Sequence, residues 1–401
     1  MTRKKVILVL LDACRGDYIN KQNTPYLYEL SKQSHYYKTL VPSFGFCERT
    51  EILVGEDGES SGYFTAFGYD EKKSPYNSFS TILSLLGVIE NKLQSAFFSK
   101  LIRRIIWEIF KKKDGTYYPA RIPLSELSNF ILTEDGKNNL IDKSDDSIYN
   151  LAKNVFYGAT TSLDKYLKGS DEDRLNLVLN ALDKKYDFYP TYVSLLDGIG
   201  HIYGPNSKEI KQALRIVDTQ IEKFITSVTK KNQNVSIVLC GDHGMSSVKS
   251  YVDLTNIFEE LIKKNLINKN TKVFFDSTMA RFWFHKKDFS SKKIIKNAIN
   301  KKYANMGYFV EKDEYKKHGI PSNRMYGDLI WLCNEGVILS PDFFTPKDKS
   351  ILGMHGYKPT DNQHYGFCLI VNSDKDRRVY ETPQPLTVVY DELKNFFIDR
   401  N

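Results

Sequence analysis

Four separate segments of the sequence end in residues of the kind that bind metal ions. Asp242 and His243 follow the apolar run 235–240 and stand between two glycines. Asp12 follows the apolar run 6–11 in the same way. One further segment carries an aspartate and a histidine four positions apart, and another carries a histidine in the context Gly-Met-His-Gly-Tyr. The candidate metal ligands are Asp12, Asp197, His201, Asp242, His243 and His355.

This set of side chains indicates a particular chemistry. Carboxylate and imidazole groups together suit zinc, with manganese or magnesium as alternatives. One zinc ion takes three or four protein ligands, so six ligands indicate two divalent metal ions. Two metals can stabilise the attacking and the leaving oxygen of a displacement at phosphorus. We therefore expect hydrolysis or transfer of a phosphoryl ester.

Each segment taken alone has an ordinary structural explanation. An aspartate after a strand is more often a helix cap or a turn residue than a ligand, and His355 could be a loop histidine. The joint occurrence of the four segments favours a metal site. The remaining histidines lack such glycine-bounded contexts and are expected to be structural or exposed; they are His35, His285, His318 and His364.

The order of these motifs resembles the alkaline phosphatase superfamily, and most closely its nucleotide pyrophosphatase/phosphodiesterase branch. The segments that show this resemblance are Leu-Asp12-Ala-Cys-Arg-Gly-Asp-Tyr, Thr24-Pro25, Asp197-x-x-x-His201-x-x-Gly-Pro, Gly-Asp242-His243-Gly-Met and His355-Gly-Tyr. The resemblance spans residues 4 to about 370. The resemblance implies that Asp197, His201 and His355 hold one metal. It implies that Asp12, Asp242 and His243 hold the other, together with the nucleophile.

The nucleophile segment departs from the family pattern. A match without gaps places Gly45 at the position of the nucleophile and Glu48 where the phosphodiesterases carry a phosphate-contacting asparagine. Three alternatives are open: attack by Cys47, attack by Ser43, or direct attack by a metal-bound hydroxide. Cys47 before Glu48 is similar to the Ser-Glu nucleophile of metal-dependent phosphoglycerate mutases, and a helix N-terminus near cations favours a thiolate. Cys47 could instead be an apolar filler.

The fold class expected from the alternation of strands and helices is α/β, with a mostly parallel central sheet and helices on both faces. Expected core strands are 6–11, 36–41, 192–196 and 235–240. Expected helices are 24–32, 48–54, 207–229 and 254–264. Residues 272–333 are expected to form a small antiparallel lobe around a helix near 292–301. Residues 1–56 and 146–401 form the predicted metal-binding core, and 57–145 form an inserted helical cap.

The insert contains a basic amphipathic segment at 91–113. Two interpretations are open: a helix at a membrane interface, or a cap helix packed on the protein with a solvated basic face. The chain has a net charge of +8. Because no nucleic-acid-binding motif accompanies this charge, we expect an anionic small ligand or a membrane surface rather than specific nucleic-acid binding.

The hydrophobic content of 41% and the mean hydropathy of -0.42 are typical of a globular protein. The sequence shows no cleavable leader, and its five cysteines form no CxxC pair, so we expect a cytoplasmic protein. The predicted function is a two-metal phosphoesterase that hydrolyses a phosphodiester or pyrophosphate bond of a small phosphorylated substrate. Alternatives are a metal-dependent phosphomutase or phosphotransferase, or a non-catalytic protein that binds a phosphorylated ligand. The sequence leaves the substrate and the oligomeric state open.

Overall fold

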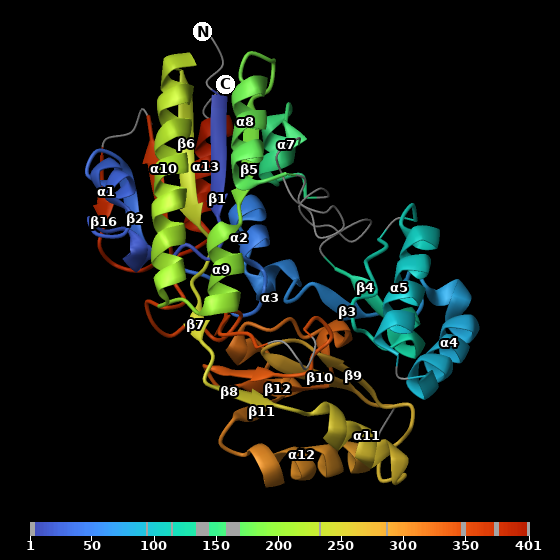
Figure 1. Cartoon of the computed structure of the whole chain (residues 1–401). Coiled ribbons are helices and arrows are strands. Elements are labelled where there is room, and N and C mark those ends of the chain that lie inside the picture. Colours follow the sequence, from blue (N-terminus) through green and yellow to red (C-terminus); the bar gives the residue numbers. More distant parts are fainter. Residues whose placement is uncertain are drawn as a thin grey trace. The chain divides into compact units, whose positions relative to one another are not determined.

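The computed structural model describes residues 5–93, 95–113, 115–133, 144–157, 169–231, 234–285, 288–345, 350–372 and 377–398. The chain forms two compact units (Figure 1). The first comprises the described residues of 1–61, 140–248 and 351–401, and the second those of 62–139 and 249–350. The second unit thus groups most of the insert expected at 57–145 with the lobe expected at 272–333, which the sequence presented as separate parts.

The first unit is built on a mixed sheet whose strand order is β16-β2-β15-β6-β1-β5, with β17 also paired to β2. The strands are β1 (Lys5–Leu11), β2 (His35–Val41), β5 (Phe188–Val193), β6 (Val235–Gly241), β15 (Gly366–Val371), β16 (Val379–Tyr380) and β17 (Gln384–Pro385). β1 runs parallel to both β5 and β6, whereas β15 is antiparallel to β6 and β2. The predicted α/β class with a mostly parallel central sheet is confirmed.

Side chains of β1 alternate between two hydrophobic cores, one on each face of the sheet. Ile7, Val9 and Leu11 belong to the core formed with α1 (Pro25–Ser31), α8 (Asp171–Ala181) and α10 (Lys208–Lys231). The intervening Val6, Leu8 and Leu10 belong to the core formed with α2 (Glu48–Val54), α7 (Ile148–Ala152) and α13 (Val388–Ile398). A strand buried on both faces requires a continuous apolar run, which is the sequence of β1. Helices therefore cover both faces, as Figure 1 shows.

One predicted strand is wrong. The sequence analysis placed a strand at 192–196, but β5 ends at Val193 and helix α9 (Leu195–Tyr203) begins two residues later. Pro190 weakened the sequence pattern of β5, because proline cannot donate a hydrogen bond within a sheet. It is accommodated because β5 is the edge strand. The other predicted core strands, and the helices predicted at 24–32, 48–54, 207–229 and 254–264, agree with the structure to within two residues at each end, whereas the helix predicted near 292–301 begins three residues earlier.

The second unit contains the predicted antiparallel lobe. Its four-stranded sheet has the order β11-β12-β10-β9. These strands are β9 (Lys272–Phe275), β10 (Met279–Trp283), β11 (Gly307–Glu311) and β12 (Leu329–Cys333), accompanied by helices α11 (Thr255–Lys263) and α12 (Phe289–Tyr303). The inserted segment contributes the two-stranded pair β3 (Phe67–Tyr69) and β4 (Phe130–Leu132). It also contributes helices α4 (Ser80–Leu93) and α5 (Ala96–Phe110).

A buried arginine ties the lobe to the inserted segment within this unit. Arg281 on β10 is fully buried and pairs with the buried Asp276 at 2.8 Å. Its guanidinium also donates a hydrogen bond of 2.6 Å to the carbonyl of Phe67 on β3, and it lies 4.9 Å from the ring centre of Phe274. Burial raises the pKa of Asp276 to about 6, although Arg281 opposes the shift. The buried Asp276 carboxylate therefore requires the positive charge of Arg281.

We predict that Arg281→Ala lowers the free energy of unfolding of this unit by about 3–5 kcal/mol, because it leaves Asp276 buried without its cation. Lys264→Ala is the matched control, since Lys264 lies at an exposed position just after α11 and pairs there with Glu260 of that helix. That control should leave stability nearly unchanged. Chemical denaturation of both variants measures the effect, and equal stabilities would contradict a structural role for the buried pair.

Candidate metal centre

The six predicted ligands converge at one edge of the sheet in the first unit. Leu11 is paired with Val193 on one side and with Gly241 on the other. The chain therefore leaves β1, β5 and β6 at the same level, and the residues that follow these strands become neighbours. Asp12 follows β1, Asp242 and His243 follow β6, and Asp197 lies in the first turn of α9 after β5.

The other two ligands come from α9 and from a short strand pair. His201 is four residues after Asp197 on the same helix, so both side chains lie on one helical face, and His201 Nε2 is 3.0 Å from Asp197 Oδ1. His355 follows β14 (Gly353–Met354), which pairs with β7 (Ser246–Ser247) just beyond His243. In this way a segment more than a hundred residues further along the chain reaches the same edge.

The donor atoms of the six residues fall into two groups. Asp12, Asp242 and His243 offer one group, and Asp197, His201 and His355 offer the other, with the atoms of each group within 4.8 Å of one another. These groups are the two triads that the sequence analysis assigned to separate metals. A further group of the same kind joins Glu48 to His243 and His355.

Backbone carbonyls orient two of the imidazoles. His201 Nδ1 lies 2.8 Å from the carbonyl oxygen of Gly353, and His243 Nδ1 lies 2.8 Å from that of Gly244. Because a carbonyl only accepts, each Nδ1 donates a proton to it, and each Nε2 faces a carboxylate: His201 Nε2 lies 3.0 Å from Asp197 Oδ1, and His243 Nε2 lies 3.1 Å from Asp12 Oδ1. Burial acts to lower the pKa of both histidines, but the neighbouring carboxylates outweigh it and raise that pKa. His355 is held differently: its ring stacks on His243 with centroids 4.0 Å apart. Its Nδ1 is buried and has no hydrogen-bond partner in the described part of the chain.

The site concentrates negative charge away from water. Burial raises the pKa of Asp12 well above its usual range, and the carboxylates of Asp197 and Asp242 add to this effect. Burial likewise raises the pKa of Asp242. It acts in the same direction on Asp197, but the neighbouring histidines outweigh it, His201 most strongly, and lower that pKa. Burial and the adjacent His243 lower the pKa of His355 well below its usual range. Such crowded carboxylates and a neutral imidazole suit cations.

Hydrogen bonds from residues that the sequence did not single out fix the aspartates. The hydroxyl of Tyr192 donates to Asp12 Oδ2. The backbone amides of Ala13 and His243 donate to Asp242 Oδ1 at 3.2 and 2.9 Å. Ala13 has a φ of 56°, a conformation that costs a non-glycine residue free energy and that is common next to functional sites.

The glycines next to Asp242 and His243 are required by close packing of the backbone. A Cβ atom at Gly241 would collide with the carbonyl oxygen of Cys14, and one at Gly244 would collide with that of Gln363. The glycines therefore let neighbouring backbone segments approach the turn that bears the ligands.

Asp171 on α8 anchors the start of α9. Its carboxylate accepts hydrogen bonds from the backbone amides of Ser194 at 3.0 Å and Leu195 at 3.1 Å, and it pairs with the buried Arg174. Arg174 in turn donates to the carbonyl of Tyr192 at 2.8 Å. No local capping signal revealed this, because the cap is supplied from 23 residues away. Asp171 thus sets the position of the helix that carries Asp197 and His201.

The predicted nucleophile candidates occupy different environments. Cys47 precedes α2 and is 1% exposed, and its thiol contacts the carbonyl of Phe44 at 3.7 Å. Burial, with help from Glu51 and Glu48, raises the pKa of Cys47 well above its usual range, so the surrounding protein groups favour the thiol. The Cys47 sulfur belongs to none of the ligand groups found among the described residues.

Ser43 is bound to a buried glutamate. Its amide and hydroxyl donate to the two carboxyl oxygens of Glu51 at 2.9 and 2.8 Å. Burial raises the pKa of Glu51 to about 8, although the bonds from Ser43 act in the opposite direction. Of the three predicted catalytic residues, only Glu48 shares a ligand group with the histidines.

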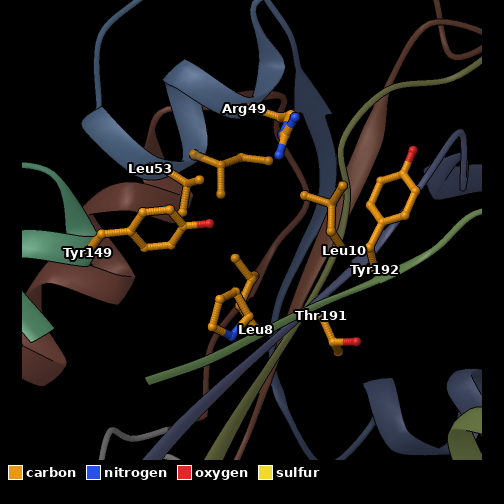
Figure 2. A pocket seen from close by; sticks show the side chains of 9 residues that line it. Leu8, Leu10, Arg49, Leu53, Tyr149, Thr191 and Tyr192 are labelled. Atoms are coloured by element: carbon orange, nitrogen blue, oxygen red, sulfur yellow. The ribbon is translucent and has the colours of Figure 1, made fainter. Parts of the chain in front are cut away.

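A cavity of about 30 Å³ lies against the face of β1 and β5 that α2 and α7 cover, and none of the six candidate ligands lines it. Figure 2 shows the Arg49 side chain and the Tyr149 hydroxyl directed toward it, whereas the hydroxyl of Tyr192 points away. The direction of that hydroxyl agrees with its bond to Asp12.

Comparison with known proteins gives a consistent result. A model of the family described as type I phosphodiesterase / nucleotide pyrophosphatase matches residues 6–358. An uncharacterized pyrophosphatase/phosphodiesterase of Schizosaccharomyces pombe is 22% identical over 370 residues, which cover 88% of this chain and 68% of that protein. The human GPI ethanolamine phosphate transferase 2 catalytic subunit is 41% identical over 96 residues, which cover 23% of this chain and 8% of that protein.

Solved structures share the fold. Murine ectonucleotide pyrophosphatase/phosphodiesterase 5 superposes with a TM-score of 0.67 at 16% sequence identity, covering 98% of this chain and 95% of that one. A structure of the murine protein as an inactive variant in complex with AMP gives a TM-score of 0.66. At this level of identity the likeness concerns the fold, and it extends over nearly the whole chain.

We predict that Asp171→Ala reduces metal affinity by about 10- to 100-fold, the usual effect of removing a group that orients ligands. Asp218→Ala is a matched control, because Asp218 on α10 accepts the amides of Tyr26 and Leu27 at the start of α1, which carries no ligand. Asp171→Ala should lower the free energy of unfolding by about 3–5 kcal/mol, because it leaves the buried Arg174 without its carboxylate, and Asp218→Ala should lower it by about 1–3 kcal/mol. Calorimetric zinc titration separates the two effects, and equal affinities in both variants would refute the positioning role.

Proposed function

Because the chain belongs to the type I phosphodiesterase/nucleotide pyrophosphatase family, we propose that it hydrolyses phosphodiester or pyrophosphate bonds with the help of two divalent metal ions. The convergence of the six side chains into two triads at one sheet edge carries this proposal. Small phosphorylated compounds are the proposed substrates, with nucleotide sugars and lipid-linked phosphates among the classes to test. The five cysteines are buried and unpaired, which supports the further proposal that the protein works in a reducing compartment.

The residues fit a pair of metal ions. Mixed nitrogen and oxygen donors in groups of three suit zinc, and manganese or magnesium would accept the same carboxylates. Asp12 and Asp242 are buried carboxylates whose pKa is raised, so a cation would relieve the unfavourable burial of their charge. The imidazoles of His201 and His243 already present Nε2 to the site. When bound, the metals would neutralise charge on the attacking and leaving oxygens.

We infer that water is the attacking group and that Glu48 accepts its proton. Gly45 has no side chain to attack with, the Cys47 thiol is buried against a carbonyl, and Ser43 is held by Glu51. The Glu48 carboxylate shares a ligand group with His243 and His355. In this reaction the water oxygen forms a bond to phosphorus, its proton passes to Glu48, and the bond from phosphorus to the leaving oxygen breaks with its electron pair on that oxygen.

We predict metal-dependent hydrolysis of bis-p-nitrophenyl phosphate. Asp242→Ala and His355→Ala should each lose bound metal and more than about 100-fold of activity, since loss of supporting groups alone costs 10- to 100-fold. His318→Ala, in the second unit, is the control and should keep both. Metal content and steady-state rates measured on the same preparations test this. Hydrolysis of only the monoester p-nitrophenyl phosphate would eliminate the phosphodiesterase proposal, and full metal content in both ligand variants would refute the metal assignment.

We predict a separate pattern for the attacking group. Cys47→Ala and Ser43→Ala should stay within about tenfold of the parent rate, equivalent to about 1.4 kcal/mol in the barrier. Glu48→Gln should lose about 10²- to 10⁴-fold, the usual contribution of a general base. Rates are measured after metal occupancy is confirmed. An inactive Cys47→Ala protein with both metals bound would instead establish covalent attack by the thiolate.

A phosphotransferase is the second candidate function. It is favoured by the local 41% identity to a protein named as an ethanolamine phosphate transferase. The same diester assay with methanol added distinguishes the two. A hydrolase yields the water product regardless of methanol, whereas a transferase yields the methyl ester in excess of its share of the solvent.

A further inference from the structure

The hairpin formed by α4 and α5 in the second unit exposes a row of large apolar side chains. Phe97 is 78% exposed, Ile109 64% and Leu85 62%. Further exposed members are Ile82, Val88, Ile89, Leu93, Leu101 and Ile105, and the exposed Phe79 lies just before α4. Isolated exposed leucines are ordinary in globular proteins, but this concentration of exposed apolar side chains on two successive helices indicates an interaction surface.

The exposed apolar stripe is distinct from the face that packs on the protein. On α5 the buried residues are Arg103, Ile106 and Phe110. Phe97, Leu101, Ile105 and Ile109 recur every fourth residue and stay exposed. Side chains at this spacing lie on one side of a helix. The helix therefore has an inner face that holds it in place and a second, outer apolar face, which the capping interpretation of the sequence did not anticipate.

Buried polar contacts fix the hairpin in this orientation. Arg103 on α5 pairs with Glu90 on α4 at 2.9 Å and donates to the carbonyl of Ile122 at 2.8 Å. Phe110 packs against Tyr76 and Phe79 with ring centroids about 5 Å apart. Rotation of α5 to bury the outer stripe would break these contacts and leave the buried guanidinium of Arg103 without its partners.

Basic residues accompany the outer apolar face. Residues 80–113 contain seven lysines and arginines and two glutamates, for a net charge of +5. Both glutamates are paired within the hairpin, Glu90 with Arg103 and Glu108 with Lys111. The side chains of Lys92, Lys100, Arg104 and Lys112 are exposed. An apolar stripe next to a cationic rim is the pattern of a helix that lies in the interface of an anionic membrane.

We propose that the outer face of α4 and α5 docks on the surface of an anionic lipid bilayer, with the apolar stripe in the headgroup region and the basic rim against lipid phosphates. The helices are 14 and 15 residues long, and none of the described helices combines the length and apolarity needed to cross a bilayer. The hairpin therefore lies on the membrane rather than spanning it. This inference is independent of the proposed chemistry at the metal centre.

Charge favours a bilayer over a second copy of the chain as the occupant. A symmetric dimer through this face would bring the same basic rim from both copies together. Like charges placed across an interface are unfavourable. Anionic lipid headgroups instead neutralise the rim, each lysine or arginine contributing a salt-sensitive attraction.

Flotation of the full chain with vesicles tests the proposal. Vesicles of phosphatidylcholine with about one third phosphatidylglycerol should carry the protein at low salt, and the bound fraction should fall as salt rises. Phe97→Ser combined with Ile109→Ser should weaken partition by about tenfold or more, and Lys100→Gln combined with Arg104→Gln by about tenfold. Phe289→Ser is the matched control, because Phe289 on α12 of the same unit is 74% exposed. It should float like the parent protein.

Two results would overturn the proposal. One is no flotation of the parent protein with anionic vesicles at low salt. The other is a stable dimer in light scattering that the Phe97→Ser, Ile109→Ser variant loses, which would assign the face to a second copy. Thermal unfolding of each variant verifies that a loss of flotation does not reflect a loss of folding, and the exposed positions predict unchanged melting temperatures.

Discussion

The parallel register of three strands is the constraint on which the candidate metal centre depends. Leu11 is paired with both Val193 and Gly241. Asp12, Asp242 and the start of α9 therefore lie together at the carboxyl ends of these three strands. A shift of one residue in either pairing would turn the ligand side chains to the opposite face of the sheet. The two hydrophobic cores that hold β1 on both faces therefore also determine where the carboxylates lie. The packing of β1 thus fixes the position of the candidate ligands.

The sequence predicted those features that local patterns encode. Apolar runs that end in an acidic residue located β1 and β6, and glycine-bounded histidines located the remaining ligands. Features that depend on distant partners were not predictable in this way. Tyr192 and Asp171 act on Asp12 and α9 through contacts that tertiary packing creates, and neither lies in a recognisable motif. The misplaced strand at 192–196 has the same origin, since the apolar residues at its end belong to a helix whose cap is supplied by another helix.

Conformational and electrostatic costs concentrate around the ligands and are compensated nearby. Ala13 adopts a left-handed conformation directly after Asp12, and its amide thereby reaches the Asp242 carboxylate. The buried carboxylates repel one another, while His201 and His243 compensate part of that charge. A group of buried carboxylates and imidazoles of this kind would gain stability from bound cations, as a candidate metal centre should. The hydrophobic cores on the two faces of the sheet stabilise the fold and compensate these unfavourable terms.

The segment 43–48, which lacks the nucleophile expected from the family pattern, is held by contacts on both sides. Ser43 joins it to α2 through both carboxyl oxygens of Glu51, and Phe46 packs edge-on against His355 at 5.4 Å. Any side chain at Gly356 would collide with the Phe46 ring, so the segment and the last ligand fit each other closely. Gly45, with a φ of 109°, allows the turn between these anchors. The turn without a side chain at position 45 is therefore ordered, and it places Glu48 in one candidate ligand group with His243 and His355.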